Sequence, residues 1–481
     1  MKLRKILDNI SATNVVGSLD KNILDITNNS QKVVEGSAFF AVKGIQFDGV
    51  KFVDDAISRG AKVVFHESDI EKYQDGITYV KVENLRKKEP FITSFFYGNP
   101  EKEIAIIGVT GTNGKSSTVS IIHFLLNRLG KKCGAVGTIA YDDGKDIYTP
   151  THTTPDSFVL SKLFRSMVNN GCNYCVMEVS SHSLVMDRVS HIKFDRVLFT
   201  NISQDHLDFH VDMKSYAEAK SILLNNLLKK DGVRIISKPR DYYNILLSKV
   251  DDRDIVIDGK KIKIDSVEQS DKGTIFNLVW DKDFVTIESK LFGKFQSENL
   301  ALSYLALKSL GFKSKDILEN IKRFKNISGR MERVGEKKLI FIDYAHTPEA
   351  LKKVLETAKD IPHSKIITVF GCGGDRDRSK RGIMGNIATT YSDLSIITDD
   401  NPRFEDSDKI ISDIEKGVVK GSLYKIVSNR REAIRTAIGE MNRDDILIIA
   451  GKGHENYQDI CGVKRVFSDR DTVLEFLNDK H

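Results

Sequence analysis

Cysteine, proline and tryptophan are scarce in this sequence. Its 481 residues include five cysteines, eight prolines and one tryptophan. An odd number of widely spaced cysteines argues against a disulfide framework. Cys172 and Cys175 form a lone Cys-x-x-Cys pair beside an apolar run, and no second pair completes a zinc site. We therefore favour core packing over zinc binding or redox chemistry for these two side chains.

Long apolar runs and clustered basic residues are also missing. No stretch approaches the roughly 18 apolar residues of a membrane-spanning helix. Polar residues follow Met1–Lys5 at once, so we expect no signal peptide, no membrane partner and a cytoplasmic location. The net charge of +6 arises from 73 basic and 67 acidic residues without a basic run, which does not favour nucleic-acid binding.

The length predicts about three domains, at roughly 150 residues per domain. Residues 1–98 mix short β-branched runs with turn signals and predict a small α/β domain. Residues 99–328 open with the apolar run Ile104–Ile107, a glycine-rich turn and an amphipathic helix, which predicts a central P-loop ATPase-like domain with a parallel sheet. In residues 329–481 strand and helix candidates alternate, which predicts a doubly wound, Rossmann-like α/β domain.

Polar or glycine residues directly follow each predicted strand of the last domain. Ligands bind at the carboxyl ends of the strands in such sheets. We therefore expect four segments to converge on one crevice: Asp343, Gly371–Asp377, Asp399–Arg403 and Gly451–Glu455.

The strongest local motif is a glycine-rich turn between the first strand and helix of the central domain. Val109 stands where the strict Walker pattern has glycine, and a turn without a ligand is the alternative. Glycines let backbone N–H groups approach phosphates, Lys115 would neutralise β- and γ-phosphate charge, and Ser116 could bind Mg²⁺. We expect ATP contacts from Thr110, Gly111, Thr112, Asn113, Gly114, Lys115, Ser116 and Ser117.

The variant Gly-Thr-Asn-Gly-Lys resembles the Mur ligases and the related folylpolyglutamate synthetases. Further motifs extend the resemblance to the Mur ligase family over nearly the whole chain. They are Met177–His182, Asp205–His210, Tyr216–Lys220, Gly329–Glu332, Asp343–Pro348, Gly373–Asp377, Asp400–Arg403 and Gly451–Glu455.

The resemblance implies an ATP-dependent, amide-bond-forming ligase of peptidoglycan biosynthesis that acts on a UDP-N-acetylmuramoyl-dipeptide. ATP would phosphorylate the terminal carboxylate of that dipeptide, and an incoming amine would displace phosphate from the acyl phosphate. An anionic carboxylate must then approach an anionic γ-phosphate. Metal ions and fixed cations must offset this repulsion, so the expected cofactor is Mg²⁺.

The resemblance assigns the catalytic roles to Lys115, Glu178, His206 and Lys220, and the metal to Ser116, Glu178, His206 and Lys220. Lys220 matches a lysine that is carbamylated in the family, which turns a cation into an anion. From the residues alone, Lys220 is a solvated helical lysine. The corresponding alternatives are a surface carboxylate that caps a turn for Glu178 and a packed, hydrogen-bonded histidine for His206.

Three further residues match ATP contacts of the family. Asn299 would lie at the base, Arg330 at the phosphates and Asp343 at the ribose. The alternative for Arg330 is a salt bridge at a hinge between domains.

The motif Asp400-Asn401-Pro402-Arg403 resembles that of the ligases that add meso-diaminopimelate. From the residues alone, Asn401 caps a helix and Pro402 lies in its first turn. The guanidinium of Arg403 would hold the second carboxylate of diaminopimelate, which L-lysine, the alternative substrate, lacks. Glu455 would accept from the distal ammonium. The full set of expected diaminopimelate contacts is Arg376, Asp400, Asn401, Pro402, Arg403, Gly451 and Glu455.

Six residues match the family's contacts to the UDP-muramoyl-peptide. The family often has Asp-Ser-Arg where this chain has Asn29–Gln31, and glutamine where it has Met186. A turn serine is the alternative for Ser30. The six are Ser30, Gln46, Thr153, Thr154, Ser180 and Arg188.

Three other functions remain possible at this point. A folylpolyglutamate synthetase-like ligase would share the phosphate site but not a uridine-binding domain. A regulatory P-loop module would bind ATP without ligation. A kinase would release no free phosphate. We expect a monomer that takes small-molecule substrates only.

Overall fold

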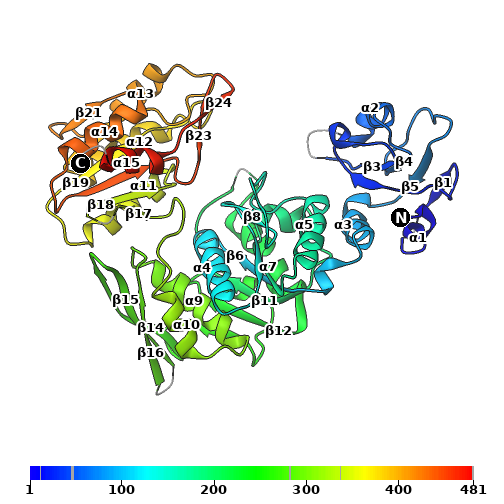
Figure 1. The fold of residues 1–481 in the computed structure, drawn as a ribbon, viewed down its shortest axis with the longest axis horizontal. Helices are drawn as coiled ribbons and strands as arrows, with labels where there is room; N and C mark the ends of the chain where they lie inside the picture. Colours follow the sequence, from blue (N-terminus) through cyan, green and yellow to red (C-terminus); the bar gives the residue numbers. More distant parts are fainter. Residues whose placement is uncertain (11, 45–47, 208, 281–282, 336, 479–481) are drawn as a thin grey trace. The chain divides into compact units, whose positions relative to one another are not determined.

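The structure is a computed structural model, and it describes every residue of the chain except 11, 45–47, 208, 281–282, 336 and 479–481. Gln46, an expected uridine contact, lies outside the described residues. The chain divides into two compact units, which are described in turn (Figure 1). The first comprises Met1–Asp258 with Leu305–Gly311, and the second comprises Gly259–Tyr304 with Phe312–His481.

The first unit begins with a five-stranded sheet in the order β1-β5-β4-β3-β2. Four strands run parallel, whereas β1 pairs antiparallel with β5. Phe40 and Phe65 stack on one face and Phe39 packs with Val64 on the other, so the sheet is buried on both sides. The elements are α1 (Leu3–Leu7), β1 (Asn14–Val16), β2 (Asp25–Thr27), η1 (Ser30–Lys32), β3 (Ser37–Ala41), η2 (Gly49–Phe52), α2 (Val53–Ser58), β4 (Val63–His66), β5 (Thr78–Lys81) and α3 (Leu85–Phe96).

An eight-stranded sheet in the order β13-β12-β11-β6-β10-β7-β8-β9 forms the rest of the first unit. Its strands run parallel except for β8 and β9, which extend one edge antiparallel. The apolar run of the sequence lies in β6, as predicted, whereas β7, β8, β9, β12 and β13 were not predicted. The strands are β6 (Ala105–Thr110), β7 (Cys133–Val136), β8 (Tyr141–Asp142), β9 (Ile147–Tyr148), β10 (Tyr174–Glu178), β11 (Phe194–Phe199), β12 (Leu228–Ser237) and β13 (Ile255–Ile257).

Helices flank this central sheet. Helix α4 packs against β7 and β10, and α7 packs against β6 and β12. Asp156 and Asp212 begin α5 and α7 by accepting hydrogen bonds from backbone N–H groups of the first turn. The helical elements are η3 (Pro100–Lys102), α4 (Lys115–Arg128), α5 (Ser157–Asn169), α6 (Ser181–Val185), α7 (Met213–Asn226) and α8 (Tyr243–Leu246).

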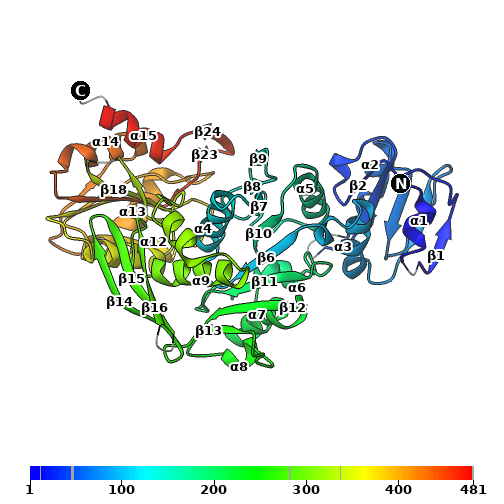
Figure 2. The same cartoon turned by 60° about the horizontal axis from the view of Figure 1, so that its bottom comes forward.

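The second unit contains a three-stranded antiparallel sheet that the sequence did not predict. Its strands β14 (Ile262–Ser270), β15 (Gly273–Trp280) and β16 (Asp283–Ser289) lie side by side (Figure 2). Helices α9 (Gln296–Ser309) and α10 (Ser314–Ile321) follow. Polar and apolar residues are mixed in these strands, so their sequence lacks the long apolar run by which a buried strand is recognised.

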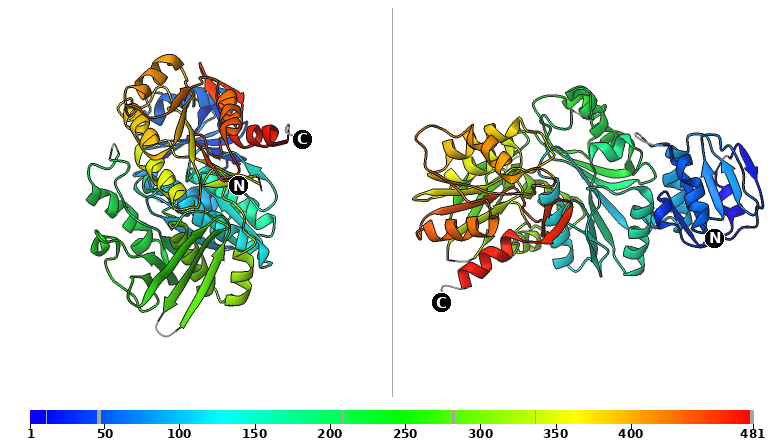
Figure 3. Two further views of the ribbon diagram at one scale, coloured as in Figure 1. Left: turned by 90° about the vertical axis from the view of Figure 1, so that its left-hand side faces the viewer. Right: turned by 90° about the horizontal axis from the view of Figure 1, so that it is seen from above.

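The second unit ends in the doubly wound sheet that the alternation predicted, in the order β17-β18-β22-β19-β20-β21. All neighbours run parallel except β17. Helices α11, α12 and α13 bury one face, and α14 and α15 bury the other (Figure 3). The elements are β17 (Glu332–Val334), β18 (Leu339–Asp343), α11 (Pro348–Lys359), β19 (Ile366–Phe370), α12 (Lys380–Tyr391), β20 (Leu394–Ile397), α13 (Ser407–Glu415), β21 (Tyr424–Ile426), α14 (Arg430–Glu440), β22 (Ile446–Ala450), β23 (Tyr457–Ile460), β24 (Val463–Val466) and α15 (Asp469–Asn478).

Two predictions about the interior can be compared with these elements. Cys172 and Cys175 are buried and unbridged, which confirms core packing. Among the described residues, no helix is long and apolar enough to cross a bilayer. The domain limits at residues 98 and 328 stay predictions.

Candidate active site

The glycine-rich loop joins β6 to α4, as the sequence predicted. Gly111 has φ +148° and Gly114 has φ +85°, which favour glycine. A Cβ on Gly111 would lie 1.9 Å from the Thr200 hydroxyl oxygen, so no side chain fits there. The Thr200 hydroxyl donates to the Asn113 carbonyl at 2.6 Å, and the Asn113 N–H donates to the Asn201 side chain at 2.9 Å. The residues that directly follow β11 thus fix the conformation of the glycine-rich loop.

Two lysines meet at one carbonyl of this loop. Lys115 Nζ donates to the carbonyl oxygens of Gly111 and Thr112, at 3.0 and 2.7 Å. Lys220 Nζ, from α7, donates to the same Gly111 oxygen at 2.8 Å and lies 4.3 Å from the centre of the Tyr216 ring. The structure therefore brings together two of the four expected catalytic residues.

Lys220 is 1% exposed, so its interpretation as a solvated lysine is wrong. The buried stripe of α7, formed by Tyr216, Ala219, Leu223 and Leu224, includes it. Burial, reinforced by the charge of nearby Lys115, holds the pKa of the Lys220 amine well below its usual range.

Glu178 is the last residue of β10, and it is buried, so its interpretation as a surface carboxylate is wrong. One carboxylate oxygen accepts the Thr138 N–H at 2.8 Å. A Cβ on Gly137 would lie 2.5 Å from that oxygen, so the glycine leaves room for the carboxylate. The Thr154 hydroxyl donates to the Glu178 carbonyl at 2.9 Å, which joins this strand end to the expected muramoyl contacts.

His206 lies in the segment between β11 and α7 at φ +55°. Its side chain is 45% exposed, so its interpretation as a packed histidine is wrong. The ring lies 4.8 Å from the His182 ring and 6.3 Å from the Tyr216 ring, and its Nε2 atom lies 3.5 Å from the Asp205 carboxylate. Within the described residues, which exclude residue 208, no group of three or more His, Cys, Asp and Glu side chains could by itself hold a metal.

The expected muramoyl contacts form a hydrogen-bonded set beside Glu178. The Ser180 N–H donates to the Thr154 hydroxyl at 3.0 Å, and Arg188 Nη1 donates to the Thr154 carbonyl at 2.9 Å. The Thr153 hydroxyl lies 3.1 Å from that of Thr138. Met186, which departs from the family pattern, places its sulfur 3.7 Å from the Arg188 guanidinium.

Ser30 lies in the N-terminal sheet domain, as the first residue of η1. It is buried, and Asn29 caps this short helix by accepting from the Gln31 N–H at 2.9 Å. The Ser30 side chain hydrogen-bonds Asp55 and helps to lower the pKa of that carboxyl group. Ser30 thus occupies a turn, and its contact with uridine stays a prediction.

Of the remaining ATP contacts, Arg330 and Asp343 lie together in the second unit. The Arg330 guanidinium lies 5.0 Å from the Tyr344 ring centre, and its charge opposes the pKa increase that burial causes at Asp343. Asp343 ends β18 and accepts the Met331 N–H at 2.7 Å. Asn299, on α9, donates to the Gln296 side chain at 2.9 Å.

The ends of β20 and β22 converge, as the topology predicted. Asn401 donates to the Glu455 carboxylate at 2.9 Å. A Cβ on Gly451 would lie 2.4 Å from the Asp400 carboxylate, so only glycine allows this approach. Arg403 Nη1 donates to the Gly374 carbonyl at 2.7 Å, which brings the loop after β19 into the same crevice.

Arg376 belongs to this crevice as well. Its side chain and that of Arg403 both border Gly373, and Arg376 is exposed. The expected diaminopimelate contacts therefore gather around the ends of three strands, and their role in binding stays a prediction.

One local prediction about this motif is wrong. Asn401 does not cap a helix and Pro402 does not lie in a first turn, because α13 begins at Ser407 and Asp406 is its cap. Instead, the backbones of Arg403 and Ile460 form an isolated β-bridge, which keeps the chain around Arg403 in a loop. The Asn401 side-chain oxygen therefore accepts hydrogen bonds within the crevice instead of capping a helix.

The sequence analysis missed two buried cations next to this motif. Lys452 Nζ donates to Asn401 and to Glu455, both at 3.0 Å. Arg430 forms a fully buried ion pair with Asp469 and donates to the carbonyls of Asp399, two residues after β20, and of Ala450, the last residue of β22. Arg430 therefore links the chain after β20 to the end of β22.

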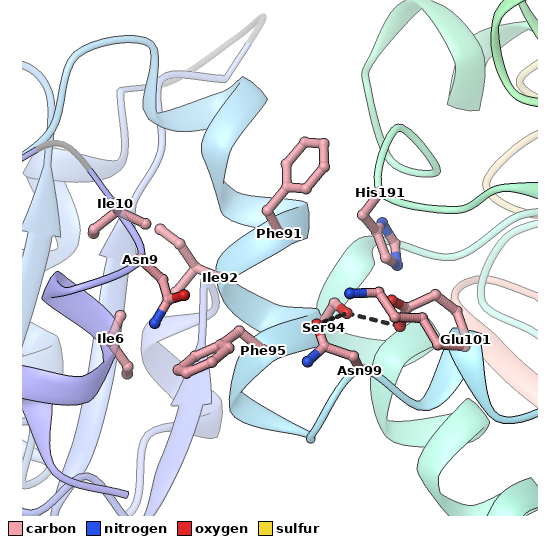
Figure 4. A pocket seen from close by; sticks show the side chains of 11 residues that line it. Ile6, Asn9, Ile10, Phe91, Ile92, Ser94, Phe95, Asn99, Glu101 and His191 are labelled. Carbon is pink, nitrogen blue, oxygen red and sulfur yellow. Dashed lines mark hydrogen bonds between the residues drawn. The ribbon is translucent and has the colours of Figure 1, made fainter.

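A separate cavity of about 230 Å³ lies beside α1 and α3 (Figure 4). Ile6, Phe95 and His191 are among its lining residues, and Ser94 donates to Glu101 at 2.7 Å. Burial lowers the pKa of His191 to about 3, so the imidazole is neutral. None of the expected site residues lines this cavity.

Comparison with known proteins places these features in a family. The family models "Mur ligase family, catalytic domain", "Mur ligase middle domain" and "Mur ligase, glutamate ligase domain" match residues 22–95, 109–307 and 329–453. UDP-N-acetylmuramoyl-L-alanyl-D-glutamate–2,6-diaminopimelate ligase of Clostridium tetani is 39% identical over 492 residues, covering 100% of both chains.

Solved structures have the same fold. A structure of a UDP-N-acetylmuramoyl-L-alanyl-D-glutamate–2,6-diaminopimelate ligase matches with a TM-score of 0.71 and 29% identity, covering 100% of this chain and 99% of that one. Folylpolyglutamate synthase of Mycobacterium tuberculosis, at 18% identity and a TM-score of 0.62, covers 76% of this chain and shares the fold alone.

The three-domain α/β fold and the glycine-rich loop define an ATP-dependent, amide-bond-forming enzyme. The chain belongs to the Mur ligase family. The resemblance drawn from the motifs is thereby confirmed.

Proposed function

We propose that the chain adds meso-2,6-diaminopimelate to the D-glutamate of UDP-N-acetylmuramoyl-L-alanyl-D-glutamate, with cleavage of ATP to ADP and phosphate. The observation that carries the proposal is the crevice at the ends of β20 and β22. There Asn401 and Glu455 are hydrogen-bonded to one another, and Arg403 reaches into the same loop cluster. The full-length relative with 39% identity has a name that states this reaction.

The phosphoryl transfer takes place at the glycine-rich loop. A carboxylate oxygen of the D-glutamate attacks the γ-phosphorus, the bond to the β-phosphate oxygen breaks, and ADP leaves. Lys115, held over the loop by two carbonyls, is placed to neutralise phosphate charge. Thr154, Ser180 and Arg188 hold the muramoyl-peptide beside the loop.

Mg²⁺ fits the donors around this loop. The Ser116 hydroxyl, the buried Glu178 carboxylate and the His206 imidazole would hold it, together with modified Lys220. Mg²⁺ needs few protein ligands, because it keeps several waters and takes phosphate oxygens. When bound, it supplies positive charge where two anionic groups approach each other.

The environment of Lys220 supports its carbamylation. A neutral amine attacks the carbon of CO₂, forms an N–C bond and loses one proton, which leaves an anionic carbamate. The lowered pKa of Lys220 favours the unprotonated amine, which is the form that reacts. The carbamate on Lys220 then places negative charge beside the cationic Lys115. Without the modification, the Lys220 amine places a second nitrogen donor there.

The second step forms the amide. The amine of diaminopimelate attacks the acyl carbon, the tetrahedral intermediate collapses, and phosphate leaves with the oxygen that came from the carboxylate. Arg403 would hold the distal carboxylate in bidentate fashion, and Glu455 would accept from the distal ammonium. The cytoplasmic location and the monomeric state stay predictions.

The proposal is tested with substrate whose D-glutamate γ-carboxylate carries ¹⁸O. An acyl-phosphate route transfers one labelled oxygen to the released phosphate for each amide formed, and mass spectrometry of the phosphate detects it. Amide formation with unlabelled phosphate would rule out this route. Phosphate release that does not depend on diaminopimelate would instead indicate a P-loop ATPase without ligase activity.

A further inference from the structure

Lys452 is fully buried between two residues of the amino-acid crevice, and no sequence motif assigned it a role. We propose that Lys452 is a positioning residue, which orients the Asn401 amide and the Glu455 carboxylate for the incoming diamino acid. This inference rests on the proposed function of the crevice. It concerns specificity for the amino acid rather than phosphoryl transfer.

The hydrogen bonds fix the Asn401 amide in one orientation. Its Oδ1 atom accepts from Lys452 Nζ at 3.0 Å and from the Asp459 N–H at 2.9 Å. Its Nδ2 atom donates to Glu455 Oε2 at 2.9 Å. A flipped amide would turn its NH₂ group toward an ammonium and a backbone N–H, both of which are donors, so Lys452 excludes it.

Glu455 is fixed by the same cation. Its Oε2 atom accepts from Lys452 Nζ at 3.0 Å as well as from Asn401. Within the described residues, Oε1 has no hydrogen bond, and the second N–H of the Asn401 amide has none either. An anionic acceptor therefore lies beside an amide donor. That pair matches an amino-acid head group, in which an ammonium adjoins a carboxylate.

The backbone around Lys452 explains why the lysine is held there. Gly451 and Gly453, on either side, have φ +116° and +54°. A Cβ on Gly453 would lie 2.7 Å from the Tyr344 Cβ, so the loop packs tightly and directs the lysine inward. Its Nζ also lies 5.5 Å from the Tyr457 ring centre. The ammonium thus has few alternatives to Asn401 and Glu455.

The test uses Lys452→Met, which keeps the volume of the side chain but removes its charge and its donors. Lys464→Met is the matched control, because Lys464 Nζ also lies over Tyr457, at 4.4 Å, but is exposed and does not contact Asn401 or Glu455. We expect Lys452→Met to raise the KM for diaminopimelate about tenfold or more, the loss expected for a hydrogen bond to a charged group. The KM for ATP and kcat should stay within about twofold, and Lys464→Met should behave as the wild type.

A second variant separates positioning from folding. Lys452→Gln retains a donor for Asn401 without the charge, so its KM for diaminopimelate should lie between those of the wild type and Lys452→Met. The melting temperature and its increase with ADP report folding independently of the crevice. Equal rises in the KM for ATP and diaminopimelate, an unchanged KM in a folded variant, or failure of both variants to fold would overturn the proposal and leave Lys452 a structural residue.

The wild-type enzyme distinguishes this inference from the proposed function. If it uses another diamino acid, the assignment of diaminopimelate fails, and the Lys452 comparison is then made with the amino acid that it does use. If it uses diaminopimelate and Lys452→Met changes nothing, only the inference fails.

Discussion

Two buried lysines lie in the two units of this ligase, and their surroundings differ in one respect. Lys220 donates to a backbone carbonyl and lies near a second cation, Lys115. Lys452 forms an ion pair with a carboxylate, Glu455, at 3.0 Å. Burial near a second cation disfavours a charged amine, whereas a carboxylate at hydrogen-bonding distance offsets the cost of burying a charge. We therefore propose that the same type of side chain reacts with CO₂ in one unit and positions two polar side chains in the other.

The largest effect is expected at the first lysine. Lys220→Ala removes the carbamate, and we expect kcat to fall by a factor on the order of 10³, as when a group that stabilises transition-state charge is lost. A short carboxylic acid should restore part of the activity by taking the place of the carbamate. Lys214→Ala, on the exposed side of the same helix, is the control and should retain activity.

An intact-mass spectrum sharpens this test. The wild type should carry a CO₂ adduct in bicarbonate, and Lys220→Ala should not. Absence of the adduct from the wild type, together with no rescue by carboxylic acids, would contradict the proposal that Lys220 reacts with CO₂.

A smaller effect is expected at the amino-acid crevice. Arg403→Ala removes the guanidinium that would hold the distal carboxylate, and we expect kcat/KM for diaminopimelate to fall about 100-fold. For L-lysine, which has no such carboxylate, the loss should be only a few-fold. Arg378→Ala removes an exposed arginine that pairs with Glu405 and is the matched control. Equal losses with both amino acids would refute the role of Arg403.

The smallest effect extends the comparison from buried lysines to a buried carboxyl group. Glu89, on α3, accepts from the Ser157 hydroxyl at 2.7 Å, and burial raises its pKa from 4.5 to about 8. Between these values the folded state keeps a proton that the unfolded state has lost, so the unfolded state binds fewer protons and stability falls as pH rises.

We therefore expect the melting temperature of the wild type to fall between pH 5.5 and 8 by about 3–5 °C more than that of Glu89→Gln. Glu83→Gln, at an exposed position, should follow the wild type. Parallel curves for Glu89→Gln and the wild type would show that Glu89 is ionised in the folded protein.

The sequence predicted the parts of the molecule that local pattern determines. The glycine-rich loop was predicted because its strand, turn and helix are contiguous, and the C-terminal sheet because its strands are apolar and alternate with helices. The antiparallel strands β14–β16 were missed because their residues are mixed in polarity. Asn401 was wrongly assigned as a helix cap because the bridge between Arg403 and Ile460, which decides its position, is a tertiary contact.

The sequence indicated the burial of one of the two lysines but not of the other. Lys220 follows Tyr216 by four residues and precedes Leu223 by three, so helical periodicity placed it on the apolar face of α7. The sequence therefore contained a signal that Lys220 is buried. Lys452 offered no such pattern, because its partners Asn401 and Glu455 come together only when β20 and β22 pair with β19 between them.

The central claim is tested most directly by phosphate release from ATP with UDP-N-acetylmuramoyl-L-alanyl-D-glutamate, measured with meso-diaminopimelate and with L-lysine in parallel. We predict phosphate release that depends on diaminopimelate and is much slower with lysine. Release mainly with lysine would retain the ligase and contradict the crevice, and no release with either amino acid would contradict the proposed reaction.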